Sequence, residues 1–139
     1  MSYLVERLAE LRRHLDHLRG LRSRVGSAED LRRDLSLHND VLFSLLTICQ
    51  NVIDVAGEMC SRRGLRFDDY TDAVRSLVSI PEFPAELVRE LEPLPGFRNV
   101  LIHEYVGLDL DRVVEALDRL DAVERFLEIV RRIQSGARD

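Results

Sequence analysis

Apolar residues recur along this chain at steps of three and four, and this spacing constrains its fold more than any other feature. Such spacing is typical of the buried face of an α-helix. In the first segment it runs through Leu4, Leu8, Leu11, Leu15 and Leu18. It returns between residues 42 and 60, and again between residues 113 and 130. No segment alternates apolar and polar residues over a useful length, so the sequence predicts an all-α fold without strands.

Capping residues, glycines and prolines set the expected helix boundaries. The stretch from Ser27 to Asp30 is typical of a capping box, and it predicts a spine helix of about 35 residues that ends at Arg63. The helices predicted after this spine cover residues 71–78, 84–91, 97–104 and 110–134. Long antiparallel helices joined by short links predict an up-down bundle of four to five helices, formed by one domain over residues 1–139.

The apolar seams of the first and last helices are long for so small a core. We therefore expect part of that surface to be buried in a second copy of the chain, as a homodimer; a crowded intramolecular core is the alternative. Cys49 and Cys60 fall on the apolar stripe of one helix, about 16 Å apart along its axis, which is too far for a disulfide. We expect two small buried residues, and neither a metal site nor a cofactor, because ligand spacings are absent.

The formal net charge is −5, but it is unevenly distributed. Residues 1–24 carry six arginines and three acidic residues, a balance of +3, so the rest of the chain carries −8. The Arg12-Arg13 pair, with His14 and His17, can guide RNA or contact a protein partner; a solvated helix face is the alternative. No apolar run approaches the roughly 20 residues of a membrane span. The charged first segment is unlike a signal peptide, so we expect a cytoplasmic protein.

One short segment, residues 96–105, carries four polar groups of different chemistry. Arg98, Asn99, His103 and Tyr105 lie within eight residues of an otherwise apolar stretch. On a helix that turns about 100° per residue, Arg98 and Tyr105 fall within about 20° of each other. Asn99 and His103 are one turn apart and share a row. All four side chains would then occupy a sector of about 160° on one face.

An arginine and a histidine on one face can cleave RNA without a metal ion. The guanidinium can bind a phosphodiester and stabilise the charge that develops on it. An imidazole can take a proton from the 2′-hydroxyl, which then attacks the adjacent phosphate and leaves a cyclic phosphate. Asn99 can hold a phosphate oxygen or fix the imidazole tautomer. Spacing alone leaves the alternative of a histidine that is hydrogen-bonded in the core or at an interface.

The pattern Arg98-x4-His103-x-Tyr105 resembles the Arg-x4-His-x-Tyr motif of HepT-like proteins, within the wider HEPN superfamily. The surrounding Gly-Phe-Arg-Asn-Val-Leu-Ile-His-Glu-Tyr and the segment Ile53-Asp54-Val55-Ala56 are also similar to that family. Chain length and segment order agree, so the resemblance covers nearly the whole chain. Pro93 and Pro95 depart from it and bear on how the motif helix enters the bundle.

The resemblance implies a homodimeric toxin, with Arg98 and His103 of both protomers lining one cleft as the catalytic residues of a metal-independent endoribonuclease. It also implies a partner, a nucleotidyltransferase antitoxin of the MntA type, which transfers AMP from ATP onto Tyr105 and silences the site. Asp54 shares a polar row with Gln50, and we expect it to orient Arg98 or His103 across the bundle. A solvated helix face is the alternative for Asp54.

Two other readings of the motif stay open. In the first, the chain is a non-catalytic module that binds a nucleotide or RNA and serves mainly as substrate and partner of the nucleotidyltransferase. In the second, it is a purely structural dimer whose Arg98, His103 and Tyr105 are buried and satisfy one another.

Overall fold

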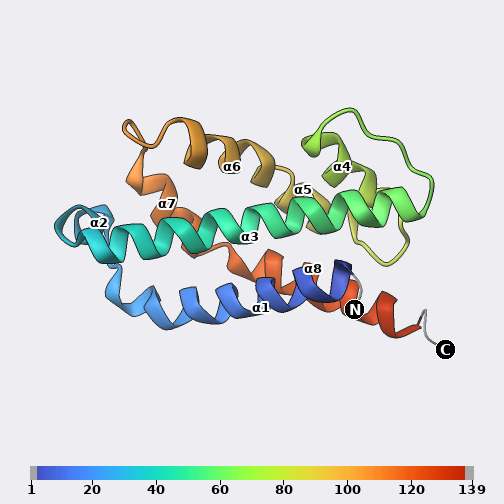
Figure 1. Ribbon diagram of the computed structural model, residues 1–139, viewed down its shortest axis with the longest axis horizontal. Helices are drawn as coiled ribbons and strands as arrows, with labels where there is room; N and C mark the ends of the chain where they lie inside the picture. Colours follow the sequence, from blue (N-terminus) through green and yellow to red (C-terminus); the bar gives the residue numbers. More distant parts are fainter. Residues whose placement is uncertain (1–2, 137–139) are drawn as a thin grey trace.

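The structure is a computed structural model that describes residues 3–136, and it consists of helices arranged around one long central helix (Figure 1). Its α-helices are α1 (Tyr3–Leu21), α2 (Ala28–Arg33), α3 (Leu35–Arg62), α4 (Tyr70–Ser76), α5 (Ala85–Leu91), α6 (Leu94–His103), α7 (Leu110–Leu117) and α8 (Leu120–Gly136). Single 3-10 turns follow α1 and α4. No strand occurs among the described residues, which confirms the predicted all-α class.

The central helix α3 contacts helices on both of its sides. In Figure 1, α1 and α8 lie along one side of α3, whereas α4, α5 and α6 lie along the other. Helix α1 runs antiparallel to α3 and packs through the predicted leucines, all of which are buried. The up-down bundle is therefore confirmed, and α3 serves as the common support for α1 and for the motif helix α6.

The predicted spine helix is wrong in one respect, because it is two helices. The capping box at Ser27 does start a helix, but α2 ends after Arg33. Asp34 then adopts an extended backbone (φ −125°, ψ 99°), and its carboxylate accepts a hydrogen bond from the Leu37 N–H at 3.1 Å. An aspartate in this conformation satisfies a free donor of the first turn and so begins the new helix α3.

The predicted last helix is also divided. Helix α7 ends at Leu117 and α8 begins at Leu120. At the break, the Asp118 N–H bonds back to the Glu115 carbonyl oxygen at 3.0 Å, and the Asp118 carboxylate accepts hydrogen bonds from Arg22. Neither glycine nor proline marks this position, so local sequence signals did not reveal it.

The basic residues of α1 hold it against the last two helices. Three arginines along one side of α1 and the turn after it pair with three acidic residues. The pairs are Arg12–Glu124, Arg19–Asp121 and Arg22–Asp118. The two histidines of α1 face α3 instead: Nδ1 of His14 lies 2.9 Å from Ser44 Oγ, and Nε2 of His17 lies 2.8 Å from an Asp40 oxygen. These contacts give the basic segment a role in packing.

Helix α3 forms the middle of the core. It is long and apolar enough to cross a membrane by length and composition alone, but 61% of its most apolar window is buried inside the bundle. Cys49 and Cys60 are both buried and free, as predicted. Burial raises the pKa of the Cys49 thiol to about 12, an effect that the nearby positive charge of Arg98 partly opposes. Cys49 is therefore a packing residue, protonated at neutral pH.

Candidate functional site

Two prolines start the motif helix. Pro95 occupies the first turn of α6, where its missing N–H leaves no intrahelical hydrogen bond unmade. The helix predicted over residues 97–104 begins three residues earlier, at Leu94, after a break between α5 and α6 at Glu92 and Pro93. Pro95, Phe97 and Leu101 are its buried residues, so they anchor α6 to the bundle. The remaining faces of α6 are left for the polar groups.

Arg98 is held by amides. It is half-buried; its Nε donates to Oε1 of Gln50 at 2.9 Å, and its Nη1 donates to Oδ1 of Asn99 at 2.9 Å. Within the described chain it forms no ion pair with a carboxylate. Two neutral acceptors thus fix the orientation of the guanidinium and leave its charge uncompensated, and Nη2 has no side-chain partner. Such a group can receive an anion without first breaking an ion pair.

Asp54 acts on Arg98 only through Gln50. Nε2 of Gln50 donates to the Asp54 carboxylate at 2.8 Å, and the same amide turns its oxygen toward Arg98. The Asp54 carboxylate also lies 3.3 Å from Nε of Arg7 on α1. The expected direct contact of Asp54 with Arg98 or His103 is therefore absent from these residues. Instead, Asp54 orders the Gln50 amide, so that its oxygen rather than its nitrogen faces the guanidinium.

His103 is the last residue of α6 and is exposed. Its imidazole makes no hydrogen bond or ion pair with any other described residue, so neither ring nitrogen has a partner there. Asn99, one turn earlier, bonds to Arg98 and does not set the imidazole tautomer. His103 and Tyr105 are both exposed in the single chain, so the motif side chains are not buried together within one chain.

Tyr105 lies outside the helix. Helix α6 ends at His103, and the exposed segment that follows turns Tyr105 away from Arg98, so the predicted shared face does not include it. The phenol O–H donates to Oδ1 of Asn39 on α3 at 3.0 Å. The Tyr105 ring also meets the His38 ring edge-on, with centroids 5.7 Å apart and planes at 86°. The motif is thus split into a helical Arg98–His103 part and a tyrosine docked on α3.

A hollow between α1, α3 and α6 adjoins the Arg98 site. Its walls are formed by Arg7, Glu10, Leu46, Thr47, Gln50, Asn51, Asp54 and Ile102. Gln50, which orients Arg98, lines this hollow and links it to the guanidinium. Asn51 is buried at its floor, and its Nδ2 has no hydrogen-bond partner within the described chain. A buried amide nitrogen without a partner is uncommon in folded proteins.

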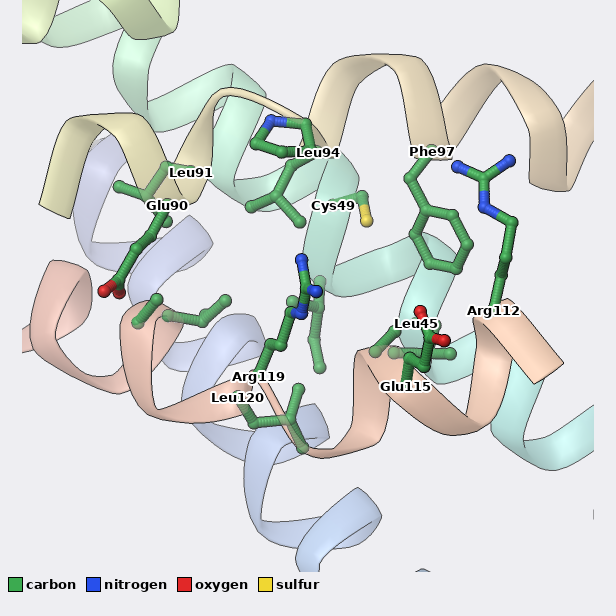
Figure 2. Close-up of a pocket in the computed structure, with 15 residues that line it drawn as sticks. Leu45, Cys49, Glu90, Leu91, Leu94, Phe97, Arg112, Glu115, Arg119 and Leu120 are labelled. Atoms are coloured by element: carbon green, nitrogen blue, oxygen red, sulfur yellow. The ribbon is translucent and has the colours of Figure 1, made fainter. Parts of the chain in front are cut away.

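The opposite side of α6 faces a different, apolar pocket (Figure 2). Leu94 and Phe97 of α6 border it together with Leu45 and Cys49 of α3 and Leu120 of α8, and charged side chains such as Arg112, Glu115 and Arg119 stand at its rim. None of the four motif residues lines this pocket. It lies on the packing side of α6, away from the side chains of Arg98 and His103. Among the described residues, no group of three or more metal-ligating side chains lies together.

Comparison with known proteins places this arrangement in a family. The family model of HepT-like proteins, described as ribonuclease HepT-like, matches residues 10–130. The chain belongs to the HepT-like family. The match covers α3 and α6, and so all of the Arg98, His103 and Tyr105 motif.

Named relatives of this HepT-like chain come from a bacterium and an archaeon. It is 22% identical over 130 residues to the mRNA nuclease HepT of Shewanella oneidensis, covering 92% of this chain and 96% of that protein. It is 33% identical over 114 residues to a putative RNase of Archaeoglobus fulgidus, covering 79% and 84% of the two chains. The matches span nearly whole proteins, so the family assignment concerns the chain as a unit.

Solved structures agree on the fold. The HEPN toxin of Shewanella oneidensis, tri-AMPylated and in complex with an MNT antitoxin, superposes with a TM-score of 0.79 at 22% identity, covering 94% of this chain and 98% of that one. A mutant toxin–antitoxin structure of the same type gives a TM-score of 0.81 at 21% identity, with the same coverage. This HepT-like chain therefore has the fold of those toxins.

Sequence reasoning missed three residues of the HepT-like site: Gln50, His38 and Asn39. Gln50 stood in the polar row of Asp54, which was the available signal, but its contact with Arg98 spans 48 positions. Asn39 and Tyr105 are 66 positions apart in the sequence, and no local pattern predicts their hydrogen bond.

Proposed function

We propose that this chain is a metal-independent RNA endonuclease, the toxin component of a HepT/MntA-type toxin–antitoxin system. The observation that carries the proposal is the pairing of two side chains on the short helix α6. The Arg98 guanidinium contacts two amides and no carboxylate, and the exposed His103 imidazole has no partner among the described residues. One group binds a phosphate and the other exchanges protons, which is the minimum set for cutting RNA through its own 2′-hydroxyl. The names of the relatives support the same activity.

The reaction needs both groups at one phosphodiester. Neutral His103 takes the proton of the 2′-hydroxyl, and the 2′-oxygen forms a bond to the adjacent phosphorus. The bond from phosphorus to the 5′-oxygen of the next nucleotide breaks, a protonated imidazole gives that oxygen its proton, and a 2′,3′-cyclic phosphate remains. Arg98 binds the non-bridging oxygens, where negative charge increases in the transition state. Asn99, exposed beside Arg98, keeps the guanidinium fork turned toward the phosphate.

A second copy of the chain completes the site. The step uses one imidazole as base and one as acid, and each chain supplies one His103. Large apolar side chains stand exposed at this side of the bundle, Phe43 at 63% and Ile102 at 40%, and Ile102 lines the hollow with the unpartnered Asn51 amide. We infer a homodimer in which the partner covers this hollow and both Arg98–His103 pairs face one cleft.

Tyr105 is the point of control. The Shewanella oneidensis toxin structure is tri-AMPylated and bound to an MNT antitoxin. We infer that a nucleotidyltransferase of that type transfers AMP onto the Tyr105 hydroxyl here. Each added nucleotide brings bulk and negative charge two residues from His103, which repels an RNA backbone. We place this system in the cytoplasm and treat residues 1–139 as one HepT-like domain.

Cleavage of a fluorescent oligoribonucleotide in excess EDTA tests the proposal. The wild-type chain is expected to cut it and leave 2′,3′-cyclic ends, whereas His103→Ala loses about 10²–10⁴-fold in rate because the proton acceptor is gone. His17→Ala, which removes an exposed imidazole of α1, is the matched control and keeps the rate. Binding of RNA without any cutting by excess wild-type chain would instead favour the non-catalytic module.

A further inference from the structure

Tyr105 has a defined docking place on α3, formed by His38 and Asn39, which we call the tyrosine seat. Oδ1 of Asn39 accepts the phenol O–H at 3.0 Å. Nδ1 of His38 lies 3.2 Å from the same oxygen, and its ring packs edge-on against the phenol. A carbonyl oxygen has two lone pairs, so Asn39 can accept from the phenol and the imidazole together. The seat thus fixes both the ring and the hydroxyl of Tyr105.

Exposure alone does not distinguish Tyr105 as a nucleotide acceptor. Tyr70 is exposed to the same extent, 49% against 49%, and its hydroxyl makes no side-chain hydrogen bond within the described chain. What Tyr105 has and Tyr70 lacks is the seat. Tyr70 therefore serves as an internal control for exposure.

The seat matters because the segment around Tyr105 has little else to hold it. Residues 104–107 are all exposed, and Val106 projects entirely into solvent. In the seat, the phenolic proton points at Asn39, so the lone pairs of the oxygen face outward. A nucleophile already held in its reactive orientation avoids the entropy cost of being ordered during the reaction.

We propose that Asn39 and His38 are positioning residues that present the Tyr105 phenol to an incoming nucleoside triphosphate. This inference rests on the proposed control of the toxin by AMP transfer. In that step the phenol oxygen forms a bond to the α-phosphorus of ATP, and the bond from this phosphorus to the oxygen that bridges to the β-phosphate breaks. Pyrophosphate leaves and the phenolic proton passes to solvent.

The chemical type of the acceptor fits this role. A carboxylate at position 39 would accept the phenol O–H as well as the amide does. It would also place a negative charge about 3 Å from the oxygen that attacks an anionic triphosphate, and that repulsion opposes the reaction. A neutral amide orients the hydroxyl without this cost. If the seat served only to anchor the segment, an aspartate at position 39 would support AMP transfer as well as the asparagine does.

The test measures AMP transfer from ATP to the full chain by an MNT-type nucleotidyltransferase, with the modified tyrosine located by peptide mass spectrometry. Asn39→Ala is expected to lower the maximal transfer rate about tenfold while the KM for ATP stays constant, because one orienting hydrogen bond is lost. Asn39→Asp is expected to be slow as well, and Asn39→Gln to recover part of the rate. Ser36→Ala, exposed one turn earlier on α3, is the matched control and keeps the wild-type rate.

A second variant separates positioning from folding. His38→Phe keeps a ring against Tyr105 and is expected to retain more of the transfer rate than His38→Ala, while thermal unfolding confirms that both fold. Transfer to Tyr105 of Asn39→Ala at the wild-type rate, or full activity of Asn39→Asp, would overturn the seat and leave the proposed function intact. Absence of transfer to Tyr105 in the wild-type chain would overturn the proposed control itself.

Discussion

The arginines of α1 and the arginine of α6 have opposite surroundings. Arg12, Arg19 and Arg22 each contact a carboxylate of α7, α8 or the turn between them, and Arg7 contacts Asp54. Arg98 contacts only the amides of Gln50 and Asn99. Several arginines of α1 thus hold helices together through ion pairs, whereas Arg98 on the motif helix contacts no carboxylate among the described residues.

This difference explains why charge counts along the sequence mislead. In the segment with the highest positive charge, residues 1–24, three of the six arginines pair with acidic residues about a hundred positions away. Arg98, which can bind a phosphate without first breaking an ion pair, lies instead in a mostly apolar segment of the sequence. Local positive charge shows where basic residues are, whereas their partners in the fold determine which of them can bind an anion.

Arg98→Ala should have the largest effect. Removal of the guanidinium takes away the charge that stabilises the transition state, so the rate of RNA cleavage should fall about 10²–10³-fold. Thermal unfolding should change little, because the groups left behind are amides that water can satisfy. Arg66→Ala is the control, because Arg66 is exposed and forms no ion pair or side-chain hydrogen bond with residues 3–136. Equal losses of cleavage rate in both variants would mean that Arg98 acts only through the net positive charge of the chain and not through a specific phosphate contact.

Gln50→Glu should give Arg98 a carboxylate partner, as the arginines of α1 have. The new carboxylate would lie where the amide oxygen now accepts from Arg98 Nε at 2.9 Å, and the resulting ion pair would compete with the phosphate. Because Gln50 now donates to the Asp54 carboxylate at 2.8 Å, the change is made together with Asp54→Asn, and Asp54→Asn alone is the reference. We expect the rate of RNA cleavage to fall about tenfold, measured under single-turnover conditions, with the fold retained. A rate equal to that of the reference would show that a free guanidinium is not required.

Arg12→Ala should affect stability and not cleavage. Arg12 and Glu124 are both partly buried between α1 and α8, so loss of the pair should lower the free energy of unfolding by about 1 kcal/mol. Urea denaturation measures this change, and the cleavage rate per folded chain is the second readout. A drop in cleavage larger than the drop in folded fraction would give α1 a direct role with RNA.

Arg13→Ala should have the smallest effect. Arg13 is exposed and meets only Glu10, one turn earlier on the same helix, at 3.5 Å. Exposed pairs of this kind contribute little, so the free energy of unfolding should change by less than about 0.5 kcal/mol. A clear loss of RNA binding in this variant would restore the hypothesis that the Arg12-Arg13 pair guides RNA.

Local patterns predicted the parts of the molecule that local forces decide. The leucine spacing located α1 and its buried face, and the motif spacing placed Arg98 and His103 on one short helix. The helix breaks at Asp34 and Asp118 were not predicted, because each involves an aspartate whose backbone conformation and hydrogen-bond partners are not visible in the sequence. The helix turn angle also placed Tyr105 beside Arg98, although α6 ends two residues earlier. Contacts such as Gln50–Arg98 and Asn39–Tyr105 form only once distant helices pack together.

The salt dependence of RNA binding tests the central claim most directly. A 2′-O-methyl oligonucleotide, which cannot be cut, is titrated with wild type, Arg98→Ala and Arg12→Ala by fluorescence anisotropy at several salt concentrations. Each phosphate contact on a single strand contributes about −0.7 to the slope of log affinity against log salt. Arg98→Ala should therefore reduce the slope by about 0.7 per chain, whereas Arg12→Ala should leave it unchanged. An unchanged slope for Arg98→Ala, or an equal reduction for Arg12→Ala, would contradict the account.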